Sequence, residues 1–340
     1  MNFFGLHFNG NSIIANITVC LLNGLSFFFK SISLLNLKFK SLWVTKFPAL
    51  VISVDNLSFG GTGKTTLVTA IGKFLAQKNR GFAIVTRGYK SKLEHSGAKV
   101  QPHHQAADVG DEACLYKRLF QSCISRPDVY VGKNRVHSID EAIRDGHKII
   151  LLDDGFQSTH IYKDFKIMLY NPGHHYYYLR NFKWLMKKEN FIYFYRAFPR
   201  DKEKFSHSIC GTYDFDILHF CTAAGSILET GTIGRARLMG FSALGDNDRF
   251  KNDLAAFQLV DFFPFNDHHP YTETEMRMLN DRRIEKKADY LVCTEKDYSK
   301  LTGINMEDIP LIYLRNSIKL NPNLMDYLWE YAGKQDYFQT

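Results

Sequence analysis

Apolar and polar residues follow one another in blocks that predict strands alternating with helices. Continuous apolar runs suit buried strands, and the stretches after them suit helices. The strand-like runs lie at 49–54, 81–86, 129–131, 147–152, 237–241 and 290–293, and the helix-like stretches at 67–78, 111–120, 135–145 and 272–287. This alternation predicts an α/β protein, with a mostly parallel sheet covered on both faces by flanking helices.

The N-terminal segment has a different pattern. Residues 8–29 carry no charged side chain, and about 20 apolar residues suffice to cross a bilayer. Ile17, Leu21, Leu25 and Phe28 recur at helical spacing, so the segment suits a helix lying in the membrane interface equally well. A buried core helix is the third interpretation. The lysines that follow place the downstream chain in the cytoplasm.

We therefore divide the chain into four parts. Residues 1–46 are expected to form a membrane anchor with a basic flank, 47–175 a P-loop core, 176–236 an aromatic and basic linker, and 237–340 a second, smaller α/β part. Ten aromatic residues lie between 176 and 198. This stretch suits a surface that meets lipid headgroups, or equally a linker followed by a buried strand.

Composition narrows the class of partner. The 340 residues carry a formal charge of +8, which favours acidic partners. No basic arm and no zinc-finger spacing occurs in the sequence, so we expect no nucleic acid partner. The six scattered cysteines fit a reducing compartment.

The segment from Ser58 to Thr66 predicts a phosphate-binding loop. It follows a strand-like run and precedes a helix, and Ser58 stands where the full pattern has its first glycine. The loop amides and the helix N-terminus would bind the phosphates of ATP, Lys64 would reach the β- and γ-phosphates, and Thr65 would bind Mg²⁺. The expected nucleotide-binding residues are Gly60, Gly61, Thr62, Gly63, Lys64, Thr65 and Thr66. An ordinary glycine-rich turn is the alternative.

Two further sites stand out. Asp153 and Asp154 follow a strand-like run, where a carboxylate suits Mg²⁺, although an Asp pair before a glycine also suits a simple turn. His268 and His269 lie beside an aspartate at a helix start, and surface histidines of this kind are as often inert as functional.

Taken in order, the motifs resemble the tetraacyldisaccharide 4′-kinases, the lipid A 4′-kinases. The likeness runs from about residue 21 to about residue 300 and includes an N-terminal membrane helix. Its motifs are Gly-Gly-Thr-Gly-Lys-Thr at 60–65, Thr-Arg-Gly-Tyr at 86–89, Val-Gly-Asp-Glu at 109–112, Val-Gly-Lys-Asn-Arg at 131–135, Asp-Asp-Gly-Phe-Gln at 153–157, Asp-His-His at 267–269 and Thr-Glu-Lys-Asp at 294–297.

The resemblance implies an ATP-dependent kinase that phosphorylates the 4′-hydroxyl of an acylated glucosamine disaccharide 1-phosphate. Asp111, helped by His268, would act on that hydroxyl beside Lys64. Without the family, Asp111 is an ordinary helix-start residue. Thr65, Asp153, Asp154 and Gln157 would organise Mg²⁺, and Arg87, Arg135 and Arg180 would bind substrate. We expect a monomer on the cytoplasmic face of the inner membrane.

The sequence departs from the family at several positions. Ala113 and Thr66 each replace a proline, and Ser158-Thr159 replaces His-Arg. Asn181 stands where members often have a glutamate, so a carboxylate that contacts the nucleotide is missing. The alternative function is a P-loop switch or assembly ATPase at the membrane, which needs no acceptor base.

Overall fold

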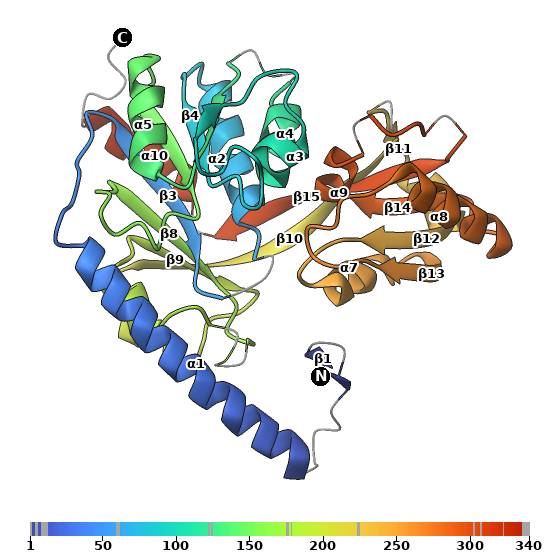
Figure 1. The fold of residues 1–340 in the computed structure, drawn as a ribbon, viewed down its shortest axis with the longest axis horizontal. Helices are drawn as coiled ribbons and strands as arrows, with labels where there is room; N and C mark the ends of the chain where they lie inside the picture. The colour runs from blue at the N-terminus through green and yellow to red at the C-terminus, as the bar shows by residue number, and fades with distance from the viewer. Residues whose placement is uncertain are drawn as a thin grey trace.

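A single large sheet forms the body of the protein (Figure 1). The computed structural model describes residues 2–3, 6–7, 13–58, 62–121, 123, 125–174, 177, 179–222, 225–301, 303–306, 308–321 and 323–334. The 13 strands run in the order β13-β12-β14-β15-β10-β9-β8-β3-β7-β4-β6-β5, with β11 paired to β10.

The strands have the following bounds: β3 Leu50–Asn56, β4 Ala83–Thr86, β5 Ala98–Lys99, β6 Asp128–Val131, β7 Ile149–Asp153, β8 Phe165–Tyr170, β9 Phe191–Tyr195, β10 Ile209–Thr222, β11 Ile227–Leu228, β12 Arg237–Ser242, β13 Gln258–Pro264, β14 Tyr290–Thr294 and β15 Leu311–Asn321. A separate pair joins β1 (Asn2–Phe3) to β2 (Leu6–His7). Within the large sheet, the pairs β10–β15, β10–β11 and β5–β6 are antiparallel.

The remaining pairs of the large sheet are parallel, so the predicted mostly parallel α/β sheet is confirmed. The antiparallel β10–β15 pair joins two parallel halves, one built around β3 and one around β12 and β14. These two long strands bridge the halves in Figure 1.

Helices cover the sheet. Their bounds are α1 Ile13–Lys40, α2 Lys64–Gln77, α3 Ala106–Val109, α4 Asp111–Leu119, α5 Arg135–Arg144, α6 Thr230–Arg235, α7 Asn247–Leu254, α8 Glu273–Glu285, α9 Glu295–Ser299 and α10 Leu324–Lys334, with 3₁₀ turns η2 Lys183–Lys188 and η3 Lys202–Phe205. The region 90–110 carries β5 and the short α3.

Both faces of the first half are buried. Alternate residues of β3 enter different cores: Leu50 and Ile52 pack in the same core as residues of α2 and α4, and Val51 packs in a core that includes residues of α5. Such two-sided burial explains why β3 opens with a continuous apolar run, Leu50 to Ile52. It also leaves the carboxyl ends of the strands as the edge where loops can carry chemistry.

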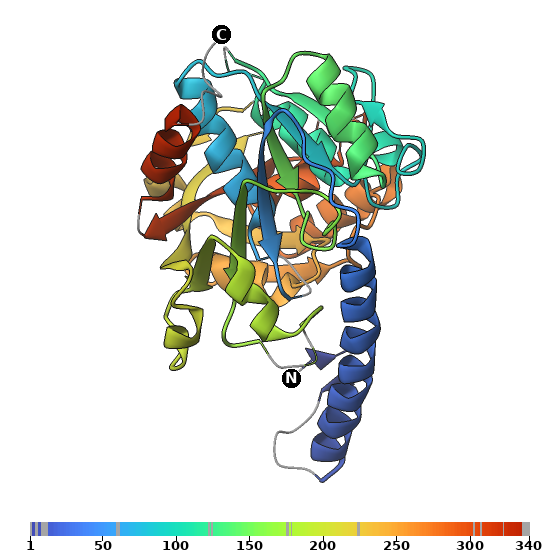
Figure 2. The same ribbon diagram turned by 90° about the vertical axis from the view of Figure 1, so that its left-hand side faces the viewer.

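Helix α1 extends beyond the body (Figure 2). Residues Ile17–Lys40 are long and apolar enough to cross a membrane by length and composition. The row predicted from the sequence is exposed, since Leu21, Leu25 and Phe28 are each more than 60 % exposed. A buried core helix is therefore ruled out as the interpretation of this segment.

The aromatic-rich stretch supplies a strand of the sheet. Phe191, Ile192, Tyr193 and Phe194 of β9 are buried between β8 and β10. Their aromatic character is therefore explained by packing. Trp184 and Phe198 of the stretch are exposed.

Candidate active site

The loop between β3 and α2 forms one end of the site. Phe59, Gly60 and Gly61 lie outside the described residues. Gly63 has φ 91°, which glycine adopts without strain, and a Cβ there would lie 2.5 Å from the Phe215 ring. Helix α2 begins at Lys64 with no side-chain cap on its first amides. Uncapped amides and the helix dipole make this end suitable for an anion.

Lys64 lies among polar groups at the carboxyl edge of the sheet. Its Nζ is 2.9 Å from Oδ1 of Asn56 and 4.0 Å from Oδ1 of Asp154. Arg180 contacts the same two residues as Lys64: its guanidinium makes two contacts to Asp154, of 3.0 and 3.2 Å, and another to Asn56. The site therefore presents two cations and one carboxylate beside the loop.

The two consecutive aspartates have different environments. Burial raises the pKa of Asp153 to about 6. Burial acts in the same direction on Asp154, but the charges of Lys64 and Arg180 outweigh it and hold the pKa of Asp154 below its usual range. Asp154 also has φ 59°, a left-handed conformation that is unusual outside glycine and common at functional sites.

Several buried polar atoms around the loop have no hydrogen-bond partner among the described residues. They are Oγ of Ser58, Oγ1 of Thr62 and Oδ1 of Asp153. The other carboxylate oxygen of Asp153 accepts a bond of 2.7 Å from the Tyr116 hydroxyl, and the Thr65 side chain also bonds to Tyr116. Buried polar groups are normally satisfied, so this part of the site suits an additional ligand.

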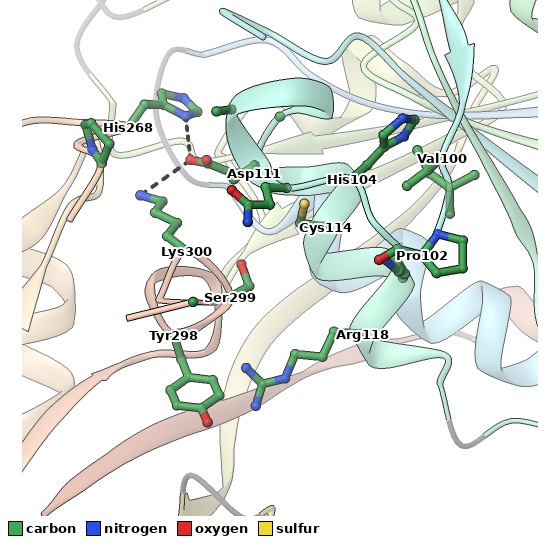
Figure 3. A pocket seen from close by; sticks show the side chains of 18 of the residues that line it. Val100, Pro102, His104, Asp111, Cys114, Arg118, His268, Tyr298, Ser299 and Lys300 are labelled. Atoms are coloured by element: carbon green, nitrogen blue, oxygen red, sulfur yellow. Dashed lines mark hydrogen bonds and ion pairs between the residues drawn. The ribbon is translucent and has the colours of Figure 1, made fainter. Parts of the chain in front are cut away.

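The other end of the site lies at the start of α4 (Figure 3). Nδ1 of His268 is 2.9 Å from Oδ2 of Asp111, although 157 residues separate the two. Lys300 Nζ lies 3.4 Å from the same oxygen. Burial alone would raise the pKa of Asp111. The His268 hydrogen bond and the charges of Lys300 and Lys296 outweigh it, so the pKa is lowered and the carboxylate stays ionised.

Two glycines bring the Arg-Gly-Tyr turn against this carboxylate. Gly110 has φ 91°, and a Cβ on it would lie 3.0 Å from Cα of Gly88, which itself has φ 65°. The close packing of the two backbones brings Tyr89 beside the histidine, with ring centroids 5.7 Å apart. The close approach of the two backbones therefore explains why Gly88 and Gly110 are glycines.

The two neighbouring histidines contact different carboxylates. His268 has φ 62° and contacts Asp111. His269 contacts Glu275, which completes the capping box of α8 with Thr272. Only His268 therefore takes part in the carboxylate pair.

Asp111 and His268 line a large cavity of about 2030 Å³ between α4 and the loops of the second half. Its walls include Tyr89, Arg118, Tyr298 and Lys300. This volume exceeds that of ordinary small-ligand pockets, about 300–1,000 Å³. The cavity therefore has room for a ligand larger than a single sugar.

The sequence-predicted arginines lie in three settings. Arg180 lies at the phosphate end beside Lys64 and Asp154, and Arg87 is paired with Glu94 at 2.7 Å. Arg135 is buried, its guanidinium donates to the Gly132 carbonyl, and burial lowers its pKa to about 10. Thr66 and Gln157 are half-buried near the loop and the Asp pair.

Asn181 is buried and accepts a bond of 2.9 Å from Ser33 of α1. The asparagine that replaces the family's glutamate thus ties the N-terminal helix to the body.

Sequence reasoning missed Lys300, Tyr116 and Asn56. Lys300 lies three residues after the last residue of the Thr-Glu-Lys-Asp motif, and this closeness to the motif was the one feature of the sequence that pointed to it. Nothing in the local sequence distinguishes Tyr116 from a core tyrosine.

A helix that opens on a lysine after a buried strand, beside an Asp pair and a carboxylate–histidine pair, defines a P-loop kinase. A family model described as tetraacyldisaccharide-1-P 4′-kinase matches residues 18–332. The chain therefore belongs to the tetraacyldisaccharide-1-P 4′-kinase family.

Known relatives agree with this placement. The tetraacyldisaccharide 4′-kinase of Rickettsia canadensis is 30% identical over 291 residues, which cover 82% of this chain and 83% of the relative. That of Caulobacter vibrioides is 28% identical over 274 residues, 74% of this chain and 76% of the relative. The crystal structure of LpxK from Aquifex aeolicus, in complex with ATP, has TM-score 0.71 at 20% identity, covering 95% of this chain and 100% of that one. This likeness confirms the fold.

Proposed function

We propose that the protein transfers the γ-phosphoryl group of ATP to the 4′-hydroxyl of a tetraacyl glucosamine disaccharide 1-phosphate, in lipid A biosynthesis. Family membership supports the reaction class. The observation that carries the proposal is the Asp111–His268 pair in a large cavity. A switch or assembly ATPase needs a phosphate loop but no such partly buried base beside an acceptor pocket.

The phosphate end binds ATP. The amides at the start of α2 and the loop residues Gly60, Gly61, Thr62 and Gly63 bind the phosphates, and Lys64 and Arg180 neutralise their charge. Arg180 acts here on the nucleotide, because its guanidinium is held next to Lys64 by Asp154. Thr65 and Thr66 complete the first turn of the helix.

The residues at the strand ends fit Mg²⁺. The buried Oδ1 of Asp153 has no hydrogen-bond partner among the described residues, and Mg²⁺ in kinase sites takes one or two carboxylates together with phosphate oxygens. Thr65, Asp153, Asp154 and Gln157 are the residues that would hold the ion. Bound there, it supplies positive charge that stabilises the phosphates during transfer.

The acceptor end activates the sugar hydroxyl. Asp111 takes the proton of the 4′-hydroxyl as that oxygen forms its bond to the γ-phosphorus and the bond to the bridging oxygen of ADP breaks. The products are ADP, the 4′-phosphorylated lipid and one proton, which leaves through Asp111. His268 orients the carboxylate. Arg87, in the turn that packs against Gly110, is the arginine proposed to meet the phosphorylated lipid on this side, whereas the buried Arg135 interacts with the charges of Asp153 and Asp154.

The exposed apolar side of α1 fits a lipid surface. We assign the protein to the cytoplasmic face of the inner membrane, because ATP is cytoplasmic and a substrate with several acyl chains stays in the bilayer. The monomeric state is part of the proposal. Anchoring at the surface raises the effective concentration of such a substrate.

Transfer from labelled ATP tests the proposal. The purified full-length protein is incubated in detergent with γ-labelled ATP, Mg²⁺ and the disaccharide 1-phosphate, and the phosphorylated position is read by NMR. We expect label at the 4′-oxygen of the distal sugar. Steady release of inorganic phosphate with no labelled lipid, across several detergents, would instead favour an ATPase.

A further inference from the structure

Lys300 makes contacts that the proposed proton transfer does not yet use. Its ammonium lies 3.4 Å from Oδ2 of Asp111 and 3.2 Å from Oδ1 of Asp297 (Figure 3 shows the first of these contacts). Its side chain is only 3 % exposed. A lysine withdrawn so far from water needs compensating anions, and here two carboxylates supply them.

The second carboxylate fixes the position of the ammonium. Asp297 is fully buried, and its oxygens also accept bonds from the Ala243 amide, at 3.2 Å, and the Thr294 hydroxyl, at 2.7 Å. Thr294 caps α9, and Lys300 follows at its end. Lys300 is therefore held by a rigid buried network, unlike a lysine of a surface ion pair.

His268 and Lys300 both approach the same oxygen of Asp111. The imidazole contact of 2.9 Å and the ammonium contact of 3.4 Å are both to Oδ2. Two partners on one oxygen fix the rotation of the carboxylate. The hydrogen bond and the ion pair both engage that oxygen, which leaves the other oxygen better placed to accept a proton.

We propose that Lys300 is a positioning residue of the acceptor site, which with His268 holds Oδ2 of Asp111 so that Oδ1 receives the proton of the sugar hydroxyl. This inference rests on the proposed kinase function. The ammonium acts through Asp111 and is assigned no contact with the substrate.

The charge of Lys300 also keeps Asp111 ionised in a buried place. An opposite charge within about 4–6 Å favours the ionised form of a carboxyl group by about 1–3 pKa units. Lys296 acts in the same direction but is itself paired with Glu112 at 3.2 Å. Among the described residues, the charged and titratable groups around Asp111 are Glu112 and Cys114 from α4, Tyr271, His268 with Asp267 beside it from the loop before α8, and Lys296 and Lys300, the latter paired with Asp297, from α9 and its end.

Lys300→Met tests the inference, with Lys300→Arg as the charge-preserving variant. We expect Lys300→Met to lower kcat by about 10–100-fold and to move the acid limb of the kcat profile up by about 1–3 pH units. The Kd for ATP, measured by direct titration, should stay within about twofold of the wild type. Lys300→Arg keeps the positive charge and should therefore return the acid limb toward the wild-type pH. A purely structural role would not depend on charge.

Two controls separate the outcomes. Lys334→Met removes a lysine from an exposed helix pair with Glu330 and should leave the profile unchanged. If Lys300→Met does not fold, the double variant Lys300→Met with Asp297→Asn removes both buried charges and is measured in its place. A wild-type acid limb in a folded, charge-free variant overturns the role of Lys300. Failure of the wild type to phosphorylate the lipid at all overturns the kinase proposal instead.

Discussion

The hydroxyl of Tyr116 donates a hydrogen bond of 2.7 Å to Oδ2 of Asp153 and thereby ties α4 to the end of β7. Asp111 starts the same helix, five residues earlier, which is a rise of about 7.5 Å. One short helix therefore carries Asp111, the proposed proton acceptor, at its first residue, and in its second turn carries Tyr116, the hydrogen-bond donor to Asp153, a proposed metal ligand. The two ends of the site are linked mechanically through α4.

Tyr116→Phe removes this link and keeps the ring. We expect the free energy of unfolding to fall by about 1.5–3 kcal/mol, because a buried carboxylate loses a partner. We also expect kcat to fall by about tenfold, since the register between α4 and β7 loosens. Urea unfolding and lipid phosphorylation measure the two effects.

Tyr130→Phe is the matched control, because Tyr130 also donates to a carboxylate, Oδ2 of Asp145 at 2.5 Å, away from the site. It should change kcat by less than about twofold. Equal losses of kcat in the two variants would mean that α4 has no special coupling role.

The packing of Gly110 on Gly88 predicts that Gly110→Ala harms both stability and activity. The new Cβ would lie 3.0 Å from Cα of Gly88 in a left-handed conformation. We expect a cost of about 2–4 kcal/mol from strain and overpacking together. Asp111 is the next residue, so kcat should fall at least about 100-fold.

Gly146→Ala separates the effect of backbone strain at positive φ from the effect of the steric contact with Gly88. Gly146 has φ 94°, close to that of Gly110, but nothing lies within 4 Å of a Cβ built there. This variant should cost about 1 kcal/mol and leave kcat unchanged. Similar kinetic defects in both variants would contradict the packing argument.

Buried Glu189 predicts a pH dependence of stability. Burial is the main cause that raises its pKa from 4.5 to about 7. Below the pKa of this carboxyl group in the unfolded chain, its contribution to the free energy of unfolding is fully present. That contribution is lost as the pH rises through the folded-state pKa of about 7. We expect the free energy of unfolding to fall by up to about 3 kcal/mol between pH 5 and pH 8 through this group.

Glu189→Gln removes the titrating group, so its unfolding free energy should fall less steeply over the same range. Chemical denaturation at several pH values measures the slope. A slope equal to that of the wild type would mean that Glu189 is ionised in the folded protein throughout this range.

The exposed row of α1 predicts lipid binding. Replacing Leu21, Leu25 and Phe28 with glutamine keeps helix propensity and removes apolar area. Each buried side chain of this size contributes about 1.5–3 kcal/mol. Partition onto phosphatidylethanolamine–phosphatidylglycerol vesicles should therefore fall at least 100-fold, by an order-of-magnitude estimate.

Glutamine at Ile227, Met278 and Ile284 is the control, because these exposed apolar side chains lie outside α1. It should leave sedimentation with the vesicles unchanged. Unchanged binding by the α1 variant would show that another surface meets the lipid.

Strands β3, β4, β6, β7, β12 and β14 and helices α2, α4, α5 and α8 were predictable from local pattern, because buried parallel strands are continuous apolar runs and α8 starts with a capping box. Strands β8, β10, β13 and β15 were not predicted. The pairing of Asp111 with His268 was not, since the residues lie 157 positions apart and only the resemblance joined them. The antiparallel β10–β15 junction also depends on a long-range pairing that local pattern does not encode. Arg135 illustrates a further limit, because its sequence context suits a ligand contact while its side chain is buried.

The central claim is that Asp111 is the proton acceptor of a site whose phosphate end works independently of it. Asp111→Asn keeps the shape of the side chain and removes its charge. Single-turnover transfer from ATP to the disaccharide 1-phosphate, measured beside the Kd for ATP, tests this most directly. The account predicts a rate at least about 100-fold lower with a Kd within about twofold of the wild type. A variant that transfers phosphate at the wild-type rate would contradict it.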